Sequence, residues 1–398
     1  MRNFATASET GPATRAYYVS NFLQAADPEG SASPYSSLPL DYYATGYQAG
    51  IWKKAWDPSS SFVFYQFSKP DDDKIHMHSD FGNFDIWRNG RYLSRKTISY
   101  SDVIAGEPNI NNKANQNDEV SSLQNNVLAF TNVALGQGAH PSYTMPSIRL
   151  GHPVVTRLES NADYGYVASD LTNVYKWDSG HSFHDTGVVS SVVREMIYIR
   201  SLETLIVFDR VVTANQTHGG SLTAAQVVTS ALHHYETAPI QDGGASDFNH
   251  WTSTNGTQVL HQTVLIPAGL TASNARLIDE ASCVDCSTVG QMRLDIDNSG
   301  AATRYHLSVL QARDTSGSNH AVGFTDSNSG DPTSGTFTVT ITPSGESATT
   351  IVFNKGASSS GGTIGVEGGS TQSLRSDVQG ITYTDNGPIW ATPVQTSP

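Results

Sequence analysis

The densest group of residues able to carry out chemistry lies between His76 and Arg91. Within it His76, His78 and Asp80 alternate along the chain, and alternate residues of a β-strand point to the same face of a sheet. Two imidazoles and a carboxylate on one face can bind a metal ion, or can place a proton-transferring histidine beside a group that orients it. The competing interpretation is a polar strand edge whose histidines form only structural hydrogen bonds.

Four cations follow within nine positions: Arg88, Arg91, Arg95 and Lys96. A guanidinium group matches a carboxylate or a sulfate with two parallel hydrogen bonds, so this concentration of positive charge indicates an anionic ligand. A solvated hairpin with charged residues guarding a sheet edge would give the same pattern. Alternate hairpin residues face opposite sides, so the four cations are not expected to reach one ligand together.

A β-hairpin is expected to position these side chains, because Asn89-Gly90 separates two strand-like runs and both residues tolerate the positive φ of a type I′ turn. Strand signals dominate from residue 41 onward. The other expected strands are 62–67, 195–199, 205–211, 305–310, 337–341 and 350–353. The sequence therefore predicts a mainly β protein of stacked antiparallel sheets, of the β-sandwich type.

The bulk composition fits this class and excludes others. Only 15% of the 398 residues are charged, 34 are glycine, and the net charge is −14. Broad binding of nucleic acid is excluded by this balance, and a site for an anionic ligand must gather its cations locally. No apolar run reaches the ~18 residues of a membrane helix. Few Lys and Glu beside many Asn, Ser and Thr are typical of secreted or periplasmic bacterial proteins, although no signal-peptide pattern is visible.

The expected organisation has three parts. Residues 1–40 hold the one helical pattern and are interpreted as a helical remnant or docking segment. Residues 41–312 are expected to form the large sandwich, and residues 313–398 to add C-terminal strands and a mobile tail. Residues 106–126 and 314–335 are polar and aperiodic, which predicts loops. Cys283 and Cys286 are interpreted as a small loop disulfide or as two idle thiols, because no second pair indicates a metal or redox site.

The stretch from Leu38 to about Tyr100 resembles the opening of the C-terminal sheet domain of heparinase II/III-like polysaccharide lyases. The lead-in Pro-x-Asp-aromatic-aromatic, a tryptophan-containing segment and a His-x-His-x-Asp-x-x-x-Phe block before a glycine-turn hairpin carry this resemblance. Here they stand at Pro39 to Tyr43, at Ile51 to Trp56, and at His76, His78, Asp80 and Phe84. Residues 193–199, 207–211 and 306–312 resemble later strands of the family, so the resemblance spans roughly residues 38–355.

The resemblance implies β-elimination on a uronic-acid polysaccharide such as a glycosaminoglycan or alginate. A base removes the proton at C5, other groups hold the carboxylate, and an acid serves the leaving oxygen. By this resemblance His76 helps to neutralise the carboxylate or acts as the base, and Tyr100 joins the catalytic site. His78 would be a metal ligand.

Substrate contacts are expected from Tyr43 and from the hairpin cations. The anionic polysaccharide is the expected partner, together with an upstream helical toroid or a second chain that completes the cleft. The family has such a toroid, and at most about forty residues of it are present in this sequence. The alternative function is therefore a non-catalytic extracellular carbohydrate-binding β-sandwich. A purely structural β-protein would leave the histidine and arginine group unexplained.

The sequence departs from the family at the metal site. Lys96 stands where the family has a ligand Asp, and the step Asn125-Asn126 stands where it has a ligand His. One ligand of three does not hold zinc usefully, so no zinc is expected. If a metal were bound, His234 would be the next candidate ligand. Otherwise His233-His234 is interpreted as structural, and Tyr175 as a core or rim residue.

Overall fold

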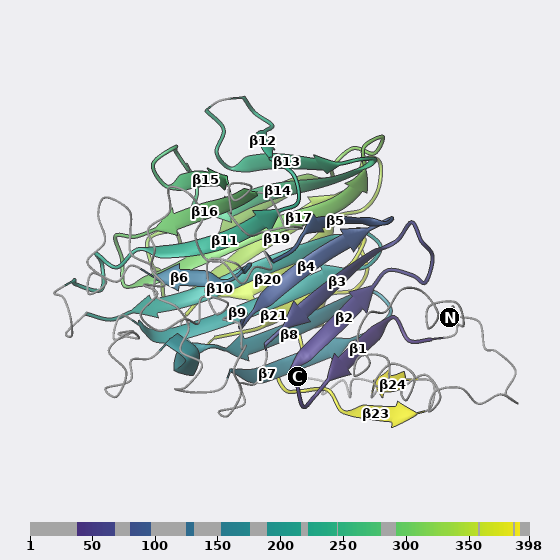
Figure 1. Cartoon of the computed structure of the whole chain (residues 1–398). Coiled ribbons are helices and arrows are strands. Elements are labelled where there is room, and N and C mark those ends of the chain that lie inside the picture. The colour runs from purple at the N-terminus through teal and green to yellow at the C-terminus, as the bar shows by residue number, and fades with distance from the viewer. Residues whose placement is uncertain are drawn as a thin grey trace, which may run out of the picture. The chain divides into compact units, whose positions relative to one another are not determined.

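The period-two patterns of the sequence are confirmed by a mainly β, antiparallel fold, seen in a computed structural model (Figure 1). The structure describes residues 38–67, 80–96, 125–130, 153–175, 189–215, 222–244, 246–279, 292–356, 359–384 and 387–390. Within these ranges the one helical element is a 3-10 turn, Thr172–Tyr175. The predicted helical segment 1–40 lies almost wholly outside the described residues.

An eight-stranded antiparallel sheet occupies the middle of the fold, in the order β12-β13-β14-β17-β10-β9-β8-β7. Its strands are β7 (Val154–Ser160), β8 (Tyr164–Asp170), β9 (Val189–Ile199), β10 (Thr204–Thr213), β12 (Ile240–Gln241), β13 (His250–Asn255), β14 (Gln258–Ile266) and β17 (Thr303–Asp314). The predicted pairing of residues 195–199 with 205–211 is confirmed by the β9–β10 register, and β17 pairs with the other side of β10.

Both faces of this central sheet are buried, because its middle strands carry apolar residues at nearly every position. Leu205 and Val207 point to one face, while Ile206 and Phe208 point to the other. A strand buried on both faces reads as a continuous apolar run, and it requires a covering layer on each side.

A five-stranded meander covers part of one face and holds the predicted hairpin. Its strands follow the chain order: β1 (Asp41–Ala44), β2 (Ala49–Lys53), β3 (Ser61–Gln66), β4 (Asn83–Arg88) and β5 (Arg91–Ser94). Asn89 and Gly90 between β4 and β5 have φ of 43° and 78°, so the type I′ hairpin is confirmed.

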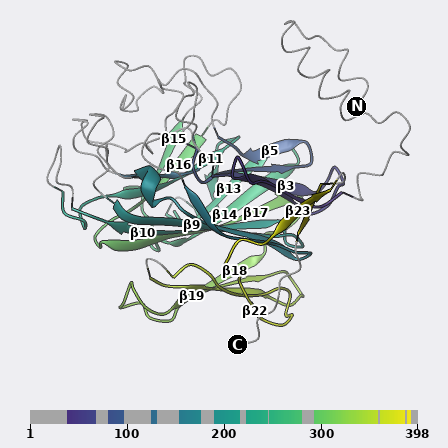
Figure 2. The same ribbon diagram turned by 90° about the horizontal axis from the view of Figure 1, so that it is seen from below.

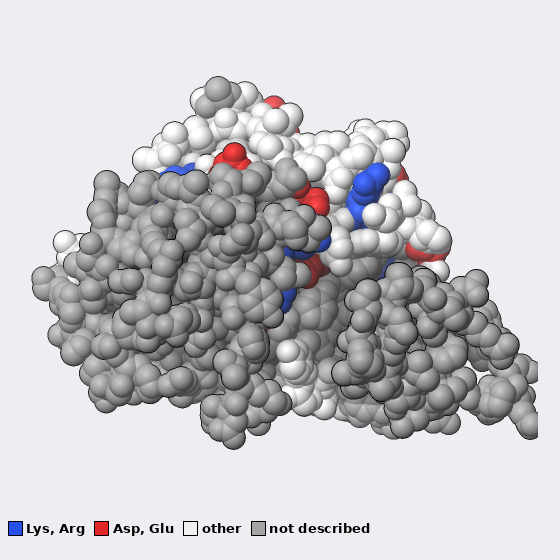
Figure 3. All heavy atoms as spheres, in the orientation of Figure 1, with Lys and Arg blue, Asp and Glu red and all other residues white. Residues whose placement is uncertain are grey.

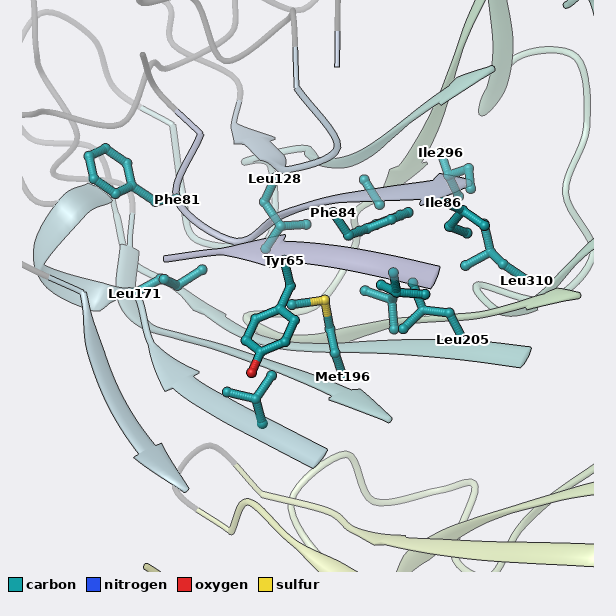
Figure 4. Packing of buried hydrophobic residues seen from close by; sticks show 14 of the residues in the cluster. Tyr65, Phe81, Phe84, Ile86, Leu128, Leu171, Met196, Leu205, Ile296 and Leu310 are labelled. Carbon is teal, nitrogen blue, oxygen red and sulfur yellow. The ribbon is translucent and has the colours of Figure 1, made fainter. Parts of the chain in front are cut away.

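A four-stranded sheet covers the rest of the same face, in the order β15-β16-β11-β6. Its strands are β6 (Leu128–Phe130), β11 (Thr229–Tyr235), β15 (Ala275–Asp279) and β16 (Met292–Asn298). Figure 2 shows both small sheets as one layer above the central sheet. Figure 4 shows Tyr65 and Phe84 of the meander and Met196 and Leu205 of the central sheet in the shared core.

The C-terminal strands cover the opposite face of the central sheet (Figure 2). The five-stranded layer consists of β18 (Ala321–Asp326), β19 (Thr336–Thr342), β20 (Thr349–Asn354), β21 (Gly362–Gly365) and β22 (Gln372–Ser373). A separate hairpin pairs β23 (Ile381–Thr384) with β24 (Gly387–Trp390).

Two expectations for this region are wrong. Residues 314–335 are not all loop, because β18 pairs with β19 there, and β24 lies in the tail that was expected to be mobile. Glycine, serine and aspartate dominate residues 314–335, and pairing to a neighbouring strand overrides their weak intrinsic preference for strands. The predicted domain boundary after residue 312 falls within β17, which ends at Asp314.

A buried ion pair joins the central sheet to the two small sheets above it. Arg194 of β9 faces Asp209 of β10 and donates to both carboxylate oxygens, at 2.7 and 2.9 Å. Its third nitrogen donates to the carbonyl oxygens of Gly82, just before β4, and Asn126, just before β6, at 2.7 and 2.6 Å. The arginine is 1% exposed, and each of its three side-chain nitrogens donates to a protein oxygen in place of the water that burial removed.

We predict that Arg194→Met lowers the free energy of unfolding by about 3–5 kcal/mol, because it leaves the Asp209 carboxylate buried without its counter-charge. Urea unfolding followed by circular dichroism measures the change. Arg91→Ala, on an exposed residue, is the matched control and should change stability by less than about 0.5 kcal/mol. Equal losses in the two variants would contradict a structural role for the buried pair.

Two neutral histidines lie between the layers. His306 of β17 bonds through Nε2 to the hydroxyl of Thr229 on β11, 2.8 Å away, and His233 of β11 packs against the ring of Phe84. Burial, assisted by the positive charges of Arg304 and Arg194, lowers the pKa of His306 to about 3. Burial likewise lowers the pKa of His233 to about 3, assisted by Arg194 and by His306. Both side chains are therefore uncharged at neutral pH.

We predict an acid-dependent loss of stability from these histidines. A folded-state pKa below the ordinary 6.5 means that the unfolded chain binds more protons, so stability is complete above pH 6.5 and falls as the pH drops toward about 3. Each histidine contributes a slope of about 1.4 kcal/mol per pH unit. His306→Gln keeps a partner for Thr229 and should remove one such slope between pH ~6 and ~4.5, in denaturant titrations. An unchanged slope would refute the assignment.

Candidate functional site

The catalytic candidates themselves lie outside the described residues. His76 and His78 belong to the segment 68–79, and Tyr100 belongs to the segment 97–124. Cys283 and Cys286 also lie outside the described ranges. The residues from which these two segments leave the sheet are described, however, and they are Phe67 and Asp80 for the first and Lys96 and Asn125 for the second.

These segment ends meet at one edge of the meander, the one at which β3 ends, β4 begins and β5 ends. The Lys96 ammonium lies 3.0 Å from the Asp80 carboxylate, which also accepts from the amide of Gln66 at 2.8 Å. The backbone N–H of Lys96 donates to Asp85 at 3.0 Å. Burial raises the pKa of Asp85, and the hydrogen bond and charge of Lys96 counter this. Asp80 and Lys96 are therefore in direct contact although sixteen positions separate them in the sequence. The segment that ends at Asp80 and the segment that begins after Lys96 meet the sheet at the same place.

Asn126 locks the fourth segment end to the same edge. Its backbone N–H donates to Asn83, and its side-chain amide donates to the carbonyl of Phe84 and to the hydroxyl of Ser94. Its side-chain oxygen accepts from the backbone N–H of His234 at 2.6 Å. The amide nitrogen and the oxygen of the Asn126 side chain are therefore both engaged in structural hydrogen bonds.

This edge does not fit a zinc ion on the ligand pattern of the family. The Lys96 ammonium is a donor with no lone pair, and it stands against Asp80. The step Asn125-Asn126 carries amides where the family has a ligand His, and the side-chain oxygen of Asn126 already accepts from the backbone of His234. Across the described ranges, no group of three or more His, Cys, Asp or Glu side chains is arranged to hold a metal ion. The two histidines of β11 alternate in direction, since His233 faces the central sheet and its neighbour His234 faces away.

Arg88 does not lie at the surface, contrary to its expected contact with substrate. It is 7% exposed and points from β4 into the fold, where Glu203 accepts from its Nε at 3.1 Å. Asp314 lies 2.9 Å from its Nη1, and Gln258 accepts from the same nitrogen. Burial would raise the pKa of Glu203, but Arg88 and Lys54 hold it below its usual range. The residue is a structural cation between β4 and the central sheet.

The other three predicted cations differ in availability. Arg95 donates to both oxygens of Glu236 at 2.6 and 2.9 Å, and Lys96 is paired with Asp80. Arg91 is exposed, and no carboxylate of the described residues pairs with it. Figure 3 shows one face of the molecule, on which some Lys and Arg atoms adjoin Asp or Glu and another group is surrounded mainly by uncharged residues.

Tyr43 was expected to contact substrate, and this is also wrong. Its side chain is 3% exposed and stacks on Tyr65 with ring centroids 6.4 Å apart, within the core shared with the central sheet. Its neighbour Tyr42 points outward and is 48% exposed. Alternation along β1 decides between the two tyrosines, and the sequence alone did not fix which of them faces the core. Tyr175 is a core residue whose hydroxyl donates to Leu128.

A hollow of about 670 Å³ lies away from this edge, between β12–β13 and β15. Ile240, Phe248, Trp251 and Leu277 line it, and it includes Arg276, which already pairs with Asp295 and Asp297. None of the residues predicted for the site takes part in it. The candidate site is therefore the edge formed by Asp80, Asp85, Lys96 and Asn126. Arg91 lies at the other end of β4 and β5, beside the Asn89-Gly90 turn.

Comparison with known proteins bears on the fold. No family model matches the sequence, and no curated relative matches it. Within the described part of the chain, no helix is long and apolar enough to cross a membrane.

Solved lyases share this architecture. A heparan sulfate lyase, HepC from Pedobacter heparinus, aligns with a TM-score of 0.53 and 12% identity over 83% of this chain and 46% of its own. A heparinase III gene product gives 0.55 and 10%, over 86% and 45%, and another heparinase III gives 0.52 and 13%, over 81% and 43%. This chain spans less than half the length of each, and what it shares with them is the fold.

Proposed function

We propose that this chain forms the β-sheet part of a polysaccharide lyase that cleaves a uronic-acid-containing polysaccharide by β-elimination. One observation carries the proposal: the segments bearing His76, His78 and Tyr100 leave the meander at a single edge, where Asp80, Lys96 and Asn126 hold their ends together. The fold shared with heparan sulfate lyases supports it. Glycosaminoglycans and alginate are the substrates to which the proposal points.

The proposed roles follow from the chemistry of β-elimination. His76 neutralises the uronate carboxylate or removes the C5 proton, and Tyr100 serves proton transfer beside it. Arg91, exposed and without a carboxylate partner among the described residues, contacts a carboxylate or sulfate of the polymer at the hairpin end of the meander. A partner domain or chain, such as the helical toroid of the family, would supply the other wall of the cleft. We place the protein outside the cytoplasm, secreted or periplasmic, where such polymers occur.

A carbohydrate-binding sandwich without catalysis is the second candidate. The observation that favours it is the Lys96–Asp80 pair, which stands where the family has a metal ligand. In this case Arg91 would still contact the polymer, and His76 and His78 would form only structural hydrogen bonds.

The activity test uses the whole chain with heparan sulfate and with alginate. Cleavage by β-elimination creates a conjugated uronate, which is followed by its ultraviolet absorbance. We predict that His76→Ala lowers the rate by about 100- to 10,000-fold, the usual cost of losing a proton-transfer group, with the fold intact. Arg91→Ala should instead mainly raise KM, because a surface cation binds the ground state and the transition state alike.

The outcomes separate the two candidates. Binding without cleavage, unchanged by His76→Ala, would favour the non-catalytic sandwich. Failure to bind or cleave any anionic polysaccharide, also when the chain is joined to a toroid partner, would reject both.

We also propose that the protein works without resident zinc. The purified chain should contain well under one zinc per molecule by elemental analysis, because Lys96 and the Asn125-Asn126 step replace two ligands of the family pattern. Dialysis against a chelator should leave the unfolding midpoint unchanged. One zinc per chain that disappears in His78→Ala would contradict this and would make His234 the next ligand to test.

A further inference from the structure

The outer face of the meander carries a row of aromatic side chains. Strand register places Lys53 of β2, Phe62 of β3, Trp87 of β4 and Tyr92 of β5 side by side on one rung. Trp56, in the turn after β2, joins the row through Lys53, whose ammonium lies 4.4 Å from its ring centroid. We call Phe62, Trp87, Tyr92 and Trp56 the aromatic platform.

The platform faces away from the core. The intervening residues Val63, Ile86 and Leu93 point inward and are 1–2% exposed, whereas Tyr92 is 38% and Trp56 36% exposed. Phe62 and Trp87 are half-buried and stack on each other, with centroids 5.1 Å apart and planes at 28°. Scattered exposed aromatics need no explanation, but an ordered row across neighbouring strands marks a binding surface.

A cation lies at each end of the row, and the two differ in whether a carboxylate pairs with them. Arg95 lies 5.0 Å from the Tyr92 ring, but Glu236 already neutralises it. Lys53 lies over Phe62 as well as Trp56, and among the residues described no carboxylate pairs with it. Burial lowers the pKa of Lys53, which means that the ammonium has lost hydration without gaining an anion. The ring faces compensate only part of this loss.

We propose that the aromatic platform with Lys53 binds the anionic polysaccharide, with sugar rings stacked on Trp87 and Tyr92 and a carboxylate or sulfate paired with Lys53. The ligand class rests on the proposed function. The geometry adds the path. Along β4, Trp87 lies four residues, or ~13 Å, from Asn83, where the strand begins beside Asp80 and Lys96. A bound chain thus reaches from the hairpin end of the meander to the edge where the catalytic segments begin.

Equilibrium binding of the whole chain to heparan sulfate, with dextran as the neutral polymer, tests the proposal. Tyr92→Ala and Trp87→Ala should each raise the Kd for heparan sulfate about 10- to 30-fold, the size expected for a central aromatic contact. Lys53→Gln should raise it about 10-fold and should flatten its dependence on salt, because the lost contact is ionic. Unfolding midpoints identify any variant that fails to fold, and Tyr92 and Lys53, the less buried pair, then carry the test.

Two variants serve as matched controls. Lys54→Gln removes the neighbouring lysine, whose charge Glu203 already holds at 3.0 Å, and Ile240→Ala removes an apolar side chain that is 66% exposed on β12. Both should bind as the unmodified chain does. If Lys54→Gln weakens binding as much as Lys53→Gln, long-range charge explains the effect and the proposal fails.

The remaining outcomes separate this site from the lyase activity. Platform-dependent binding without cleavage keeps the site and rejects the proposed activity. Cleavage with unchanged binding in Tyr92→Ala and Lys53→Gln keeps the activity and rejects the site. A dimer in sedimentation that Tyr92→Ala dissociates, with no effect on polysaccharide binding, would assign the platform to a second copy of the chain instead.

Discussion

The two small sheets above the central sheet depend on one constraint, the buried guanidinium of Arg194. It sits in the central sheet, buried, and it must donate all its hydrogen bonds or cost several kcal/mol. Asp209 satisfies one side, and the carbonyls of Gly82 and Asn126 satisfy the other. Those two carbonyls belong to the ends of the segments that carry the catalytic candidates. One buried charge therefore fixes where the segments enter the sheet, and the Lys96–Asp80 pair closes the same edge from outside.

Local signals sufficed to predict the hairpin and the six other strands named from the sequence, because an Asn-Gly turn and period-two alternation act within ten residues. The destinations of the charged side chains could not be predicted in the same way. Arg88 stands among surface-like residues in the sequence, yet its partner Glu203 lies 115 positions away and Asp314 lies on yet another strand. Tyr43 and Tyr42 exchange roles with a register shift of one residue. The platform was missed for the same reason, since its row exists only across four paired strands.

The cations of this acidic protein divide into two sets. Arg88, Arg194 and Arg200 are turned inward and bound to carboxylates, which makes them parts of the core. Lys53, on the outer face of the meander, and Arg91, exposed at its hairpin end, have no such partners among the described residues. Short-range contact rather than a general field must therefore attract a polyanion. The meander acts as a two-sided element, with one face anchored by ion pairs and the other left for a ligand.

The order of strands in the central sheet also determines when each strand can pair during synthesis of the chain. β10 pairs with β9 at once, but its other neighbour, β17, is roughly a hundred residues further along the chain. At a synthesis rate of ~5–20 residues per second, the apolar edge of β10 waits many seconds for its partner. Such an edge is a template for pairing with other chains. β14 waits for the same strand β17, and the C-terminal layer comes later still, so a nascent chain of this protein needs shelter from self-association until these strands have emerged.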